Sequence, residues 1–239
     1  MVTNPLHIIM PVKDSIEIAE KAIHAIVDSG HTLCIYDDNS LPENAQRLDA
    51  IAAATNTQVV HISTLTDHSS PNYRLVLQLA QQEALASNRH LVIVESDVII
   101  NADTLSKMSE QVQAGVGMVA AVTVDESGEY NFPYHYLRRL PYRFLTKKTI
   151  NTQKRFSFCC TLLTNELLHK ANFQLLDPTK NWYDVTISHW STRLGLHNLL
   201  MLDNPVLHFP HASRPWKRLK YTNPLLYYWR KITQQKDRI

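Results

Sequence analysis

Two carboxylates stand two residues apart in Glu95-Ser96-Asp97, directly after the apolar run Leu91 to Val94. Side chains at i and i+2 of an extended chain point to the same side, so both carboxylates can converge on one hard cation such as Mg²⁺ or Mn²⁺. The same residues would also suit an ordinary acidic loop or a helix N-cap. The pattern indicates a metal site only if other functional groups lie close to these two carboxylates.

A second acidic cluster, the segment 37–40 with Asp37 and Asp38, also follows a short apolar run. A carboxylate there can accept hydrogen bonds from a base N–H or a ribose hydroxyl, although the segment taken alone is typical of a turn. Pro11 to Asp14 ends the first apolar run in the same way. If these runs are neighbouring strands, their polar ends line one edge of one sheet.

The hydrophobic pattern predicts that strands and helices alternate along the chain. The expected strands are 6–12, 32–36, 58–62, 91–94, 118–124, 157–163, 198–202 and 206–209, and the expected helices are 15–30, 43–54, 72–86, 103–114, 164–171 and 185–194. This order favours an α/β fold with a parallel sheet covered on both faces. Ligands of such sheets bind at the carboxyl ends of the strands.

Several function classes are excluded by what the sequence lacks. Its five glycines form neither G-x-G-x-x-G after a first strand nor a Walker A loop. No apolar run reaches the roughly 18 to 20 residues that cross a bilayer. Cys34, Cys159 and Cys160 fit buried thiols better than a disulfide framework or a zinc spacing, so no thiol chemistry is expected. We expect one cytoplasmic domain.

The net charge of +2 hides two oppositely charged parts of the chain. Residues 1–129 hold 6 Lys and Arg against 17 Asp and Glu, whereas residues 130–239 hold 18 against 5. Two basic and aromatic regions, the segment 134–158 and the tail 214–238, would attract phosphate groups. These phosphates could belong to a nucleotide, an anionic membrane or a nucleic acid, and charge alone does not distinguish the three. The tail suits a membrane-surface helix and a packed amphipathic helix equally well.

The ordered motifs of the first 125 residues resemble those of the family 2 glycosyltransferases. Residues 8–14 (IIMPVKD) are similar to the family's first strand and loop, residues 33–40 (LCIYDDNS) to its second, and 95–97 (ESD) to its acidic metal motif. The resemblance implies a GT-A type three-layer α/β/α fold with a central, mostly parallel sheet. It implies a single domain, 1–239, made of a nucleotide-sugar-binding half (1–125), an acceptor-binding and catalytic half (126–213) and a basic aromatic tail (214–239).

The resemblance also implies roles for individual residues. Asp97 and Glu95 would hold Mn²⁺ or Mg²⁺, with His208 completing the metal shell. Asp184, in a segment similar to the family's Glu-Asp segment, would be the catalytic base, although it equally suits a helix N-cap. The nucleotide-binding residues would be Pro11, Asp14, Asp37, Asp38, Arg74, Ser96, Arg214 and Lys217.

The expected function is a metal-dependent, inverting transfer of one sugar. By the resemblance, the donor would be a nucleotide-diphosphate sugar, UDP-linked by family habit. The acceptor would be a glycan or lipid-linked saccharide of a bacterial surface polysaccharide pathway. A non-catalytic nucleotide- or glycan-binding member of the fold and a sugar nucleotidyltransferase stay open as alternatives. A nucleic-acid partner is not expected, because no such motif occurs. We expect a cytoplasmic protein with peripheral contact to the anionic inner face of the cell membrane.

Overall fold

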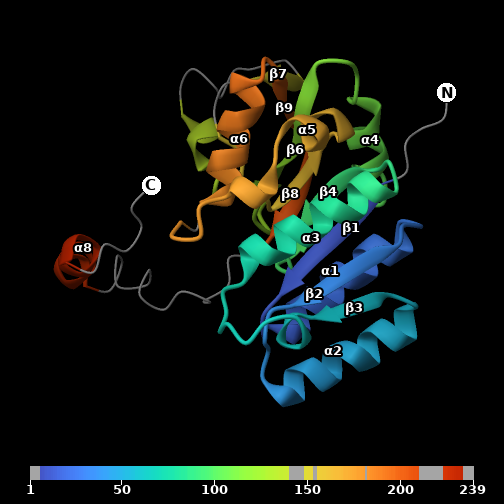
Figure 1. Ribbon diagram of the computed structural model, residues 1–239. Helices are drawn as coiled ribbons and strands as arrows, with labels where there is room; N and C mark the ends of the chain where they lie inside the picture. Colours follow the sequence, from blue (N-terminus) through green and yellow to red (C-terminus); the bar gives the residue numbers. More distant parts are fainter. Residues whose placement is uncertain (1–5, 140–147, 153–154, 181, 210–222, 234–239) are drawn as a thin grey trace. The chain divides into compact units, whose positions relative to one another are not determined.

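The computed structural model describes residues 6–139, 148–152, 155–180, 182–209 and 223–233 (Figure 1). The chain divides into two units, residues 1–209 and residues 210–239. The elements that carry the sequence motifs all belong to the first unit. In the second, the described element is helix α8 (Pro224–Thr233). No helix within the described residues is long and apolar enough to span a membrane.

A nine-stranded sheet forms the centre of the first unit within the described residues. The strands are β1 (Leu6–Val12), β2 (Leu33–Asp37), β3 (Gln58–His61), β4 (His90–Val94), β5 (Val98–Ile99), β6 (Val116–Val124), β7 (Thr149–Asn151), β8 (Cys160–Leu163) and β9 (His197–His208). Their order is β3-β2-β1-β4-β8-β6-β9-β5, with β7 paired to β9. Strands β1 to β4, β6 and β9 share one direction, and β8 lies antiparallel between β4 and β6. The mostly parallel sheet is confirmed.

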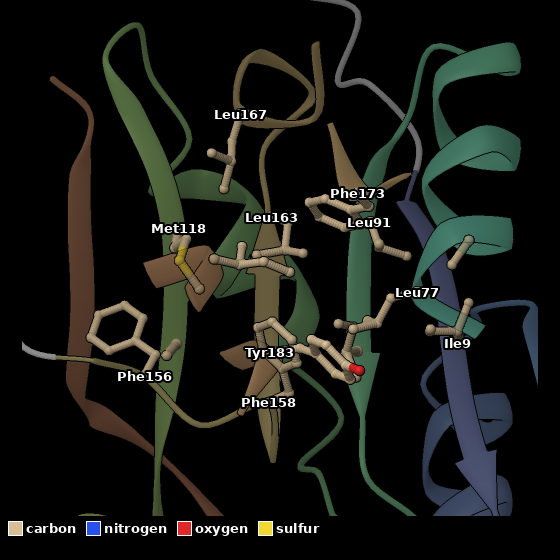
Figure 2. Packing of buried hydrophobic residues seen from close by; sticks show 14 of the residues in the cluster. Ile9, Leu77, Leu91, Met118, Phe156, Phe158, Leu163, Leu167, Phe173 and Tyr183 are labelled. Atoms are coloured by element: carbon tan, nitrogen blue, oxygen red, sulfur yellow. The ribbon is translucent and has the colours of Figure 1, made fainter. Parts of the chain in front are cut away.

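Helices cover both faces of this sheet. On one face α1 (Ile16–Asp28), α2 (Pro42–Thr55) and α4 (Thr104–Glu110) pack into one hydrophobic core, and on the other α3 (Tyr73–Ala86), α5 (Asn165–Lys170) and α6 (Tyr183–Arg193) pack into a second. Alternate residues of β1 serve the two cores: Ile8 and Met10 join the first, and Ile9 joins the second, which Figure 2 shows. The three-layer α/β/α architecture is confirmed.

Three expected boundaries are wrong. The strand expected at 157–163 begins only at Cys160, because the preceding phenylalanines, Phe156 and Phe158, turn into the core (Figure 2). The helix expected at 103–114 ends at Glu110. The two strands expected at 198–202 and 206–209 are one continuous strand, β9. Its pairing with β6 shifts register between Ala121 and Thr123.

A glycine in β6 determines how closely α6 packs on the sheet. A Cβ on Gly117 of β6 would collide with Oγ of Ser191 on α6 and would lie 2.9 Å from Cβ of Leu196. Glycine therefore lets the helix pack directly on the strand backbone. This packing holds α6, which carries Asp184 in its first turn, against the sheet.

Candidate active site

The loops after β1 and β2 meet at the carboxyl edge of the sheet. Val12 lies opposite Asp37 in the parallel register, and Pro11 lies opposite Tyr36. Asp14 follows β1 with φ +52°, and its Oδ1 accepts hydrogen bonds from the Leu41 N–H and from Asn44 Nδ2, both at 2.9 Å. The first loop is thus tied to the start of α2.

The carboxylates of Asp37 and Asp38 are both buried and hydrogen-bonded. Asp37 accepts from the Ser40 N–H at 3.1 Å and contacts Nδ1 of His61 at 2.9 Å. Asp38 accepts from Ser70 Oγ at 2.7 Å and from both the backbone and the side-chain nitrogens of Asn72, at 3.0 and 2.8 Å. These contacts join the end of β2 to the chain that leads into α3, so the second loop is held in one conformation.

The β4–β5 turn places the other acidic pair against β9. Strand β5 pairs antiparallel with the end of β9, with Val98 opposite His208, and the Phe209 N–H donates to the carbonyl of Asp97 at 2.9 Å. Oδ2 of Asp97 lies 3.3 Å from Nε2 of His208, and both side chains are buried. Sheet pairing therefore brings together residues 111 positions apart in the sequence, as the metal prediction requires.

Glu95 completes this group. Its backbone N–H donates to the Cys159 carbonyl at 2.9 Å, and its Oε2 accepts from the Cys159 thiol at 3.2 Å. Burial, followed by the nearby Asp97 carboxylate, raises the pKa of Glu95 from 4.5 to about 7; Asp184 adds to the rise, and the Cys159 hydrogen bond and His208 oppose it. The carboxylates of Glu95 and Asp97 therefore repel each other in a buried site.

A divalent cation would relieve this repulsion. Carboxylate oxygens are the ligands that Mg²⁺ and Mn²⁺ prefer, and an imidazole nitrogen suits the transition metal of the two. Glu95, Asp97 and His208 therefore fit the expected ion by their chemistry and by their place at one edge of the sheet. Among the described residues, the group of His, Cys, Asp and Glu side chains close enough to hold a metal is Glu95, Cys159 and His208.

Asp184 lies in the first turn of α6, next to the acidic pair. Its charge contributes to the raised pKa values of Glu95 and Tyr73. Its Oδ1 accepts from the Val185 N–H at 2.8 Å, and its carbonyl accepts from Ser188 Oγ at 2.7 Å. The N-cap of α6 is Trp182, so the alternative expectation of an Asp184 N-cap is wrong.

Two site residues were missed at the level of sequence. Tyr73, the first residue of α3, has a buried hydroxyl with no hydrogen-bond partner among the described residues, and burial and then Glu95 raise its pKa well above 10. Cys159 is buried as expected, but its thiol contacts Glu95 rather than only apolar neighbours. The sequence signal that could have identified Tyr73 is its place next to Arg74, which was predicted as a site residue. No local pattern distinguishes Cys159 from an ordinary buried cysteine.

The remaining predicted nucleotide-binding residues are Ser96, Arg74, Arg214 and Lys217. Ser96 is buried inside the β4–β5 turn, between the two acids. Arg74 reaches from α3 to the carbonyl of Leu176, which its Nη1 approaches at 3.4 Å. Arg214 and Lys217 lie outside the described residues. Their nucleotide-binding roles stay predictions.

The comparison with protein families decides the membership of the chain. The family model described as Glycosyl transferase family 2 matches residues 7–171, which is more than half of the sequence. The chain belongs to glycosyl transferase family 2. The match contains the loops of Asp14, Asp37 and Asp97 and also Cys159, while Asp184 and His208 lie beyond it. No curated protein sequence matches this glycosyltransferase.

Solved structures of other glycosyltransferases share the fold. TarS of S. aureus is similar with a TM-score of 0.61 at 12% identity, over 96% of this chain and 40% of that one. GalNAc-T7 with UDP, GalNAc and Mn²⁺ is similar with a TM-score of 0.60 at 11% identity, over 86% and 44%. Glucosyl-3-phosphoglycerate synthase of Mycobacterium tuberculosis with Mn²⁺, UDP and glucosyl-3-phosphoglycerate gives 0.56 at 16% identity, over 90% and 75%. The chain spans less than half the length of the first two.

Proposed function

We propose that this family 2 glycosyltransferase moves one sugar from a nucleotide-diphosphate sugar, UDP-linked, to a glycan or lipid-linked saccharide in bacterial surface polysaccharide synthesis. The observation that carries the donor is the pair Glu95 and Asp97, held against His208 at the sheet edge where Asp37 and Asp38 also lie. The similar structures support a diphosphate donor, since two of them contain UDP and Mn²⁺.

The proposed donor site uses both acidic loops. Asp37 or Asp38 accepts hydrogen bonds from the base or ribose, Pro11 and Asp14 frame the nucleotide, and Arg74, Ser96, Arg214 and Lys217 contact the nucleotide or its phosphates. Glu95, Asp97 and His208 hold Mn²⁺ or Mg²⁺. When bound, the ion supplies positive charge for the diphosphate, as a leaving group needs.

Asp184 is the proposed base for an inverting transfer. Its carboxylate takes the proton of the acceptor hydroxyl while that oxygen attacks the anomeric carbon from the face opposite the diphosphate. One C–O bond forms to the acceptor, the C–O bond to the diphosphate breaks, and the nucleoside diphosphate leaves. The location of Asp184 within electrostatic reach of Glu95 supports this role, because it brings the base close to the proposed donor site.

Calorimetry with UDP, GDP, CDP and dTDP tests the donor proposal. We expect one diphosphate, UDP, to bind in the presence of Mn²⁺ and to lose affinity in EDTA. Asp97→Asn should weaken this Mn²⁺-dependent binding. Asp103→Asn is its matched control, because Asp103 is an exposed acid on the N-terminal side of α4 that pairs with Lys107. Binding without turnover of any UDP-sugar would instead favour the non-catalytic alternative. A product NMR spectrum that retained the donor's anomeric configuration would contradict inversion.

We further propose that α8 contacts the anionic inner face of the cell membrane, which would make this cytoplasmic enzyme peripheral. Leu225, Tyr228 and Trp229 share one helix face by their spacing and are 85%, 52% and 58% exposed. Residues 214–239 contain eight Lys and Arg and one acid, so charge favours an anionic surface.

Sedimentation with lipid vesicles tests this contact. The full chain is expected to sediment with phosphatidylglycerol vesicles and to stay in solution with phosphatidylcholine vesicles. Trp229→Ala should weaken the binding, whereas Leu175→Ala, a change at an exposed leucine of the first unit, should not. Equal binding to both lipids, or none to either, would contradict the proposal.

A further inference from the structure

One thiol lies among the acidic residues of the site. The Sγ of Cys159 is 3.2 Å from Oε2 of Glu95, and ligand atoms of Glu95, Cys159 and His208 all lie within 4.8 Å of one another. The three side chains come from three separate places in the fold: the turn after β4, the residue before β8 and the end of β9. Sheet pairing holds them together, so this is not a flexible surface cluster.

The donor set differs from that of a magnesium site. It combines a carboxylate oxygen, a thiol sulfur and an imidazole nitrogen, which together are typical of zinc, whereas Mg²⁺ binds oxygen ligands. A fourth donor is close, because Oδ2 of Asp97 lies 3.3 Å from Nε2 of His208.

The neighbouring cysteine lies in a different environment. Cys160 is also buried, but its Sγ lies 3.8 Å from the sulfur of Met108 on α4, with no carboxylate contact among the described residues. Cys160 belongs to β8 and pairs opposite Val94, whereas the carbonyl of Cys159 accepts the Glu95 N–H. The two adjacent thiols therefore provide a site residue and its matched control.

We propose that Glu95, Cys159 and His208 form a binding site for a thiophilic divalent cation of the Zn²⁺ class, which blocks the enzyme by occupying two of its Mn²⁺ or Mg²⁺ ligands. The thiol proton leaves for the buffer as the sulfur–metal bond forms, and no oxidant or reductant is needed. The inference shares side chains with the proposed donor site, but its metal chemistry does not depend on glycosyl transfer.

Cobalt is the probe, because Co²⁺ takes zinc sites and reports its ligands by absorption. Titration of the metal-free full chain with Co²⁺ should produce a near-ultraviolet sulfur-to-cobalt charge-transfer band, and Zn²⁺ should then remove it. The band should vanish in Cys159→Ser, which keeps a hydrogen-bond donor beside Glu95, and should persist in Cys160→Ser. No band in the wild type, or a band that survives Cys159→Ser, would overturn the proposal.

A second readout separates this inference from the proposed function. In Cys160→Ser and in the wild type, Zn²⁺ added in the presence of excess Mn²⁺ should weaken UDP binding at least tenfold, measured by calorimetry. If no nucleotide binds under any condition while the cobalt band behaves as expected, the donor proposal fails and the thiolate site stands. If UDP binds with Mn²⁺ but Zn²⁺ has no effect and no cobalt band forms, the thiolate site fails alone.

Discussion

The site contains two acidic pairs, Asp37 with Asp38 and Glu95 with Asp97. Both pairs stand at the ends of parallel strands, but their carboxylates contact different kinds of groups. The first pair accepts hydrogen bonds from two backbone N–H groups, a hydroxyl and an amide, and also contacts His61. The second pair faces other carboxylates, a thiol and one histidine. The first pair is held by hydrogen-bond donors of the protein, whereas the second consists of two carboxylates close enough to repel each other. This difference supports the proposal that the second pair binds the cation, while the hydrogen bonds of the first pair hold its loop in place for the nucleotide.

The largest expected effect comes from Asp184, the proposed base. Asp184→Asn should lower the rate of sugar transfer roughly 10²- to 10⁴-fold, because an amide cannot take the acceptor proton. UDP affinity with Mn²⁺ should be kept, since Asp184 is not among the proposed ligands. Rate assays at saturating donor measure the first quantity and calorimetry the second.

The control for that change is Asp177→Asn, at an exposed acid shortly before α6 that pairs with Lys180. It should leave the transfer rate near that of the wild type. An Asp184→Asn enzyme with full activity would show that a different group removes the proton.

The second-largest expected effect is a difference in folding stability between variants of the two acidic pairs. Asp38→Ala should cost about 3 kcal/mol of unfolding free energy in the metal-free protein, because the buried Asn72 donors lose their acceptor. Asp97→Asn should keep or raise that free energy, because it removes one of two crowded negative charges. Urea unfolding in EDTA measures both variants. The reverse ranking would mean that the two pairs have been assigned the wrong roles.

The smallest effect concerns pH and the first pair. The hydrogen bond to Asp37 raises the pKa of His61, despite the opposing effect of its partial burial, and Asp49 adds to the rise. A raised pKa in the folded state gives stabilisation that is complete below pH 6.5 and is lost as pH rises through the folded value. His61→Gln should therefore be less stable than the wild type at pH 5.5, by less than about 1 kcal/mol because the His61 side chain is partly exposed to solvent.

Urea unfolding at several pH values follows this difference. The two proteins should converge above the raised pKa of His61. A stability gap that widened with increasing pH would contradict an ionic contact between His61 and Asp37.

The sequence predicts the first acidic pair and its loops better than it predicts the complete second site. Asp37 and Asp38 follow a strand whose apolar run ends just before them, so a local pattern places them. The contact of Cys159 with Glu95 depends on β8 entering antiparallel between β4 and β6, and no local pattern encodes that pairing. His208 was predicted from the family resemblance, although the continuous β9 that carries it was expected as two strands.

The most direct test of the account is UDP calorimetry in Mn²⁺ and in EDTA for the wild type, Asp97→Asn and Asp37→Asn. If the second pair binds the cation, EDTA weakens UDP binding to the wild type and to Asp37→Asn but has no further effect on Asp97→Asn. UDP binding to Asp97→Asn that remained as sensitive to EDTA as the wild type would contradict the assignment of the cation to the second pair.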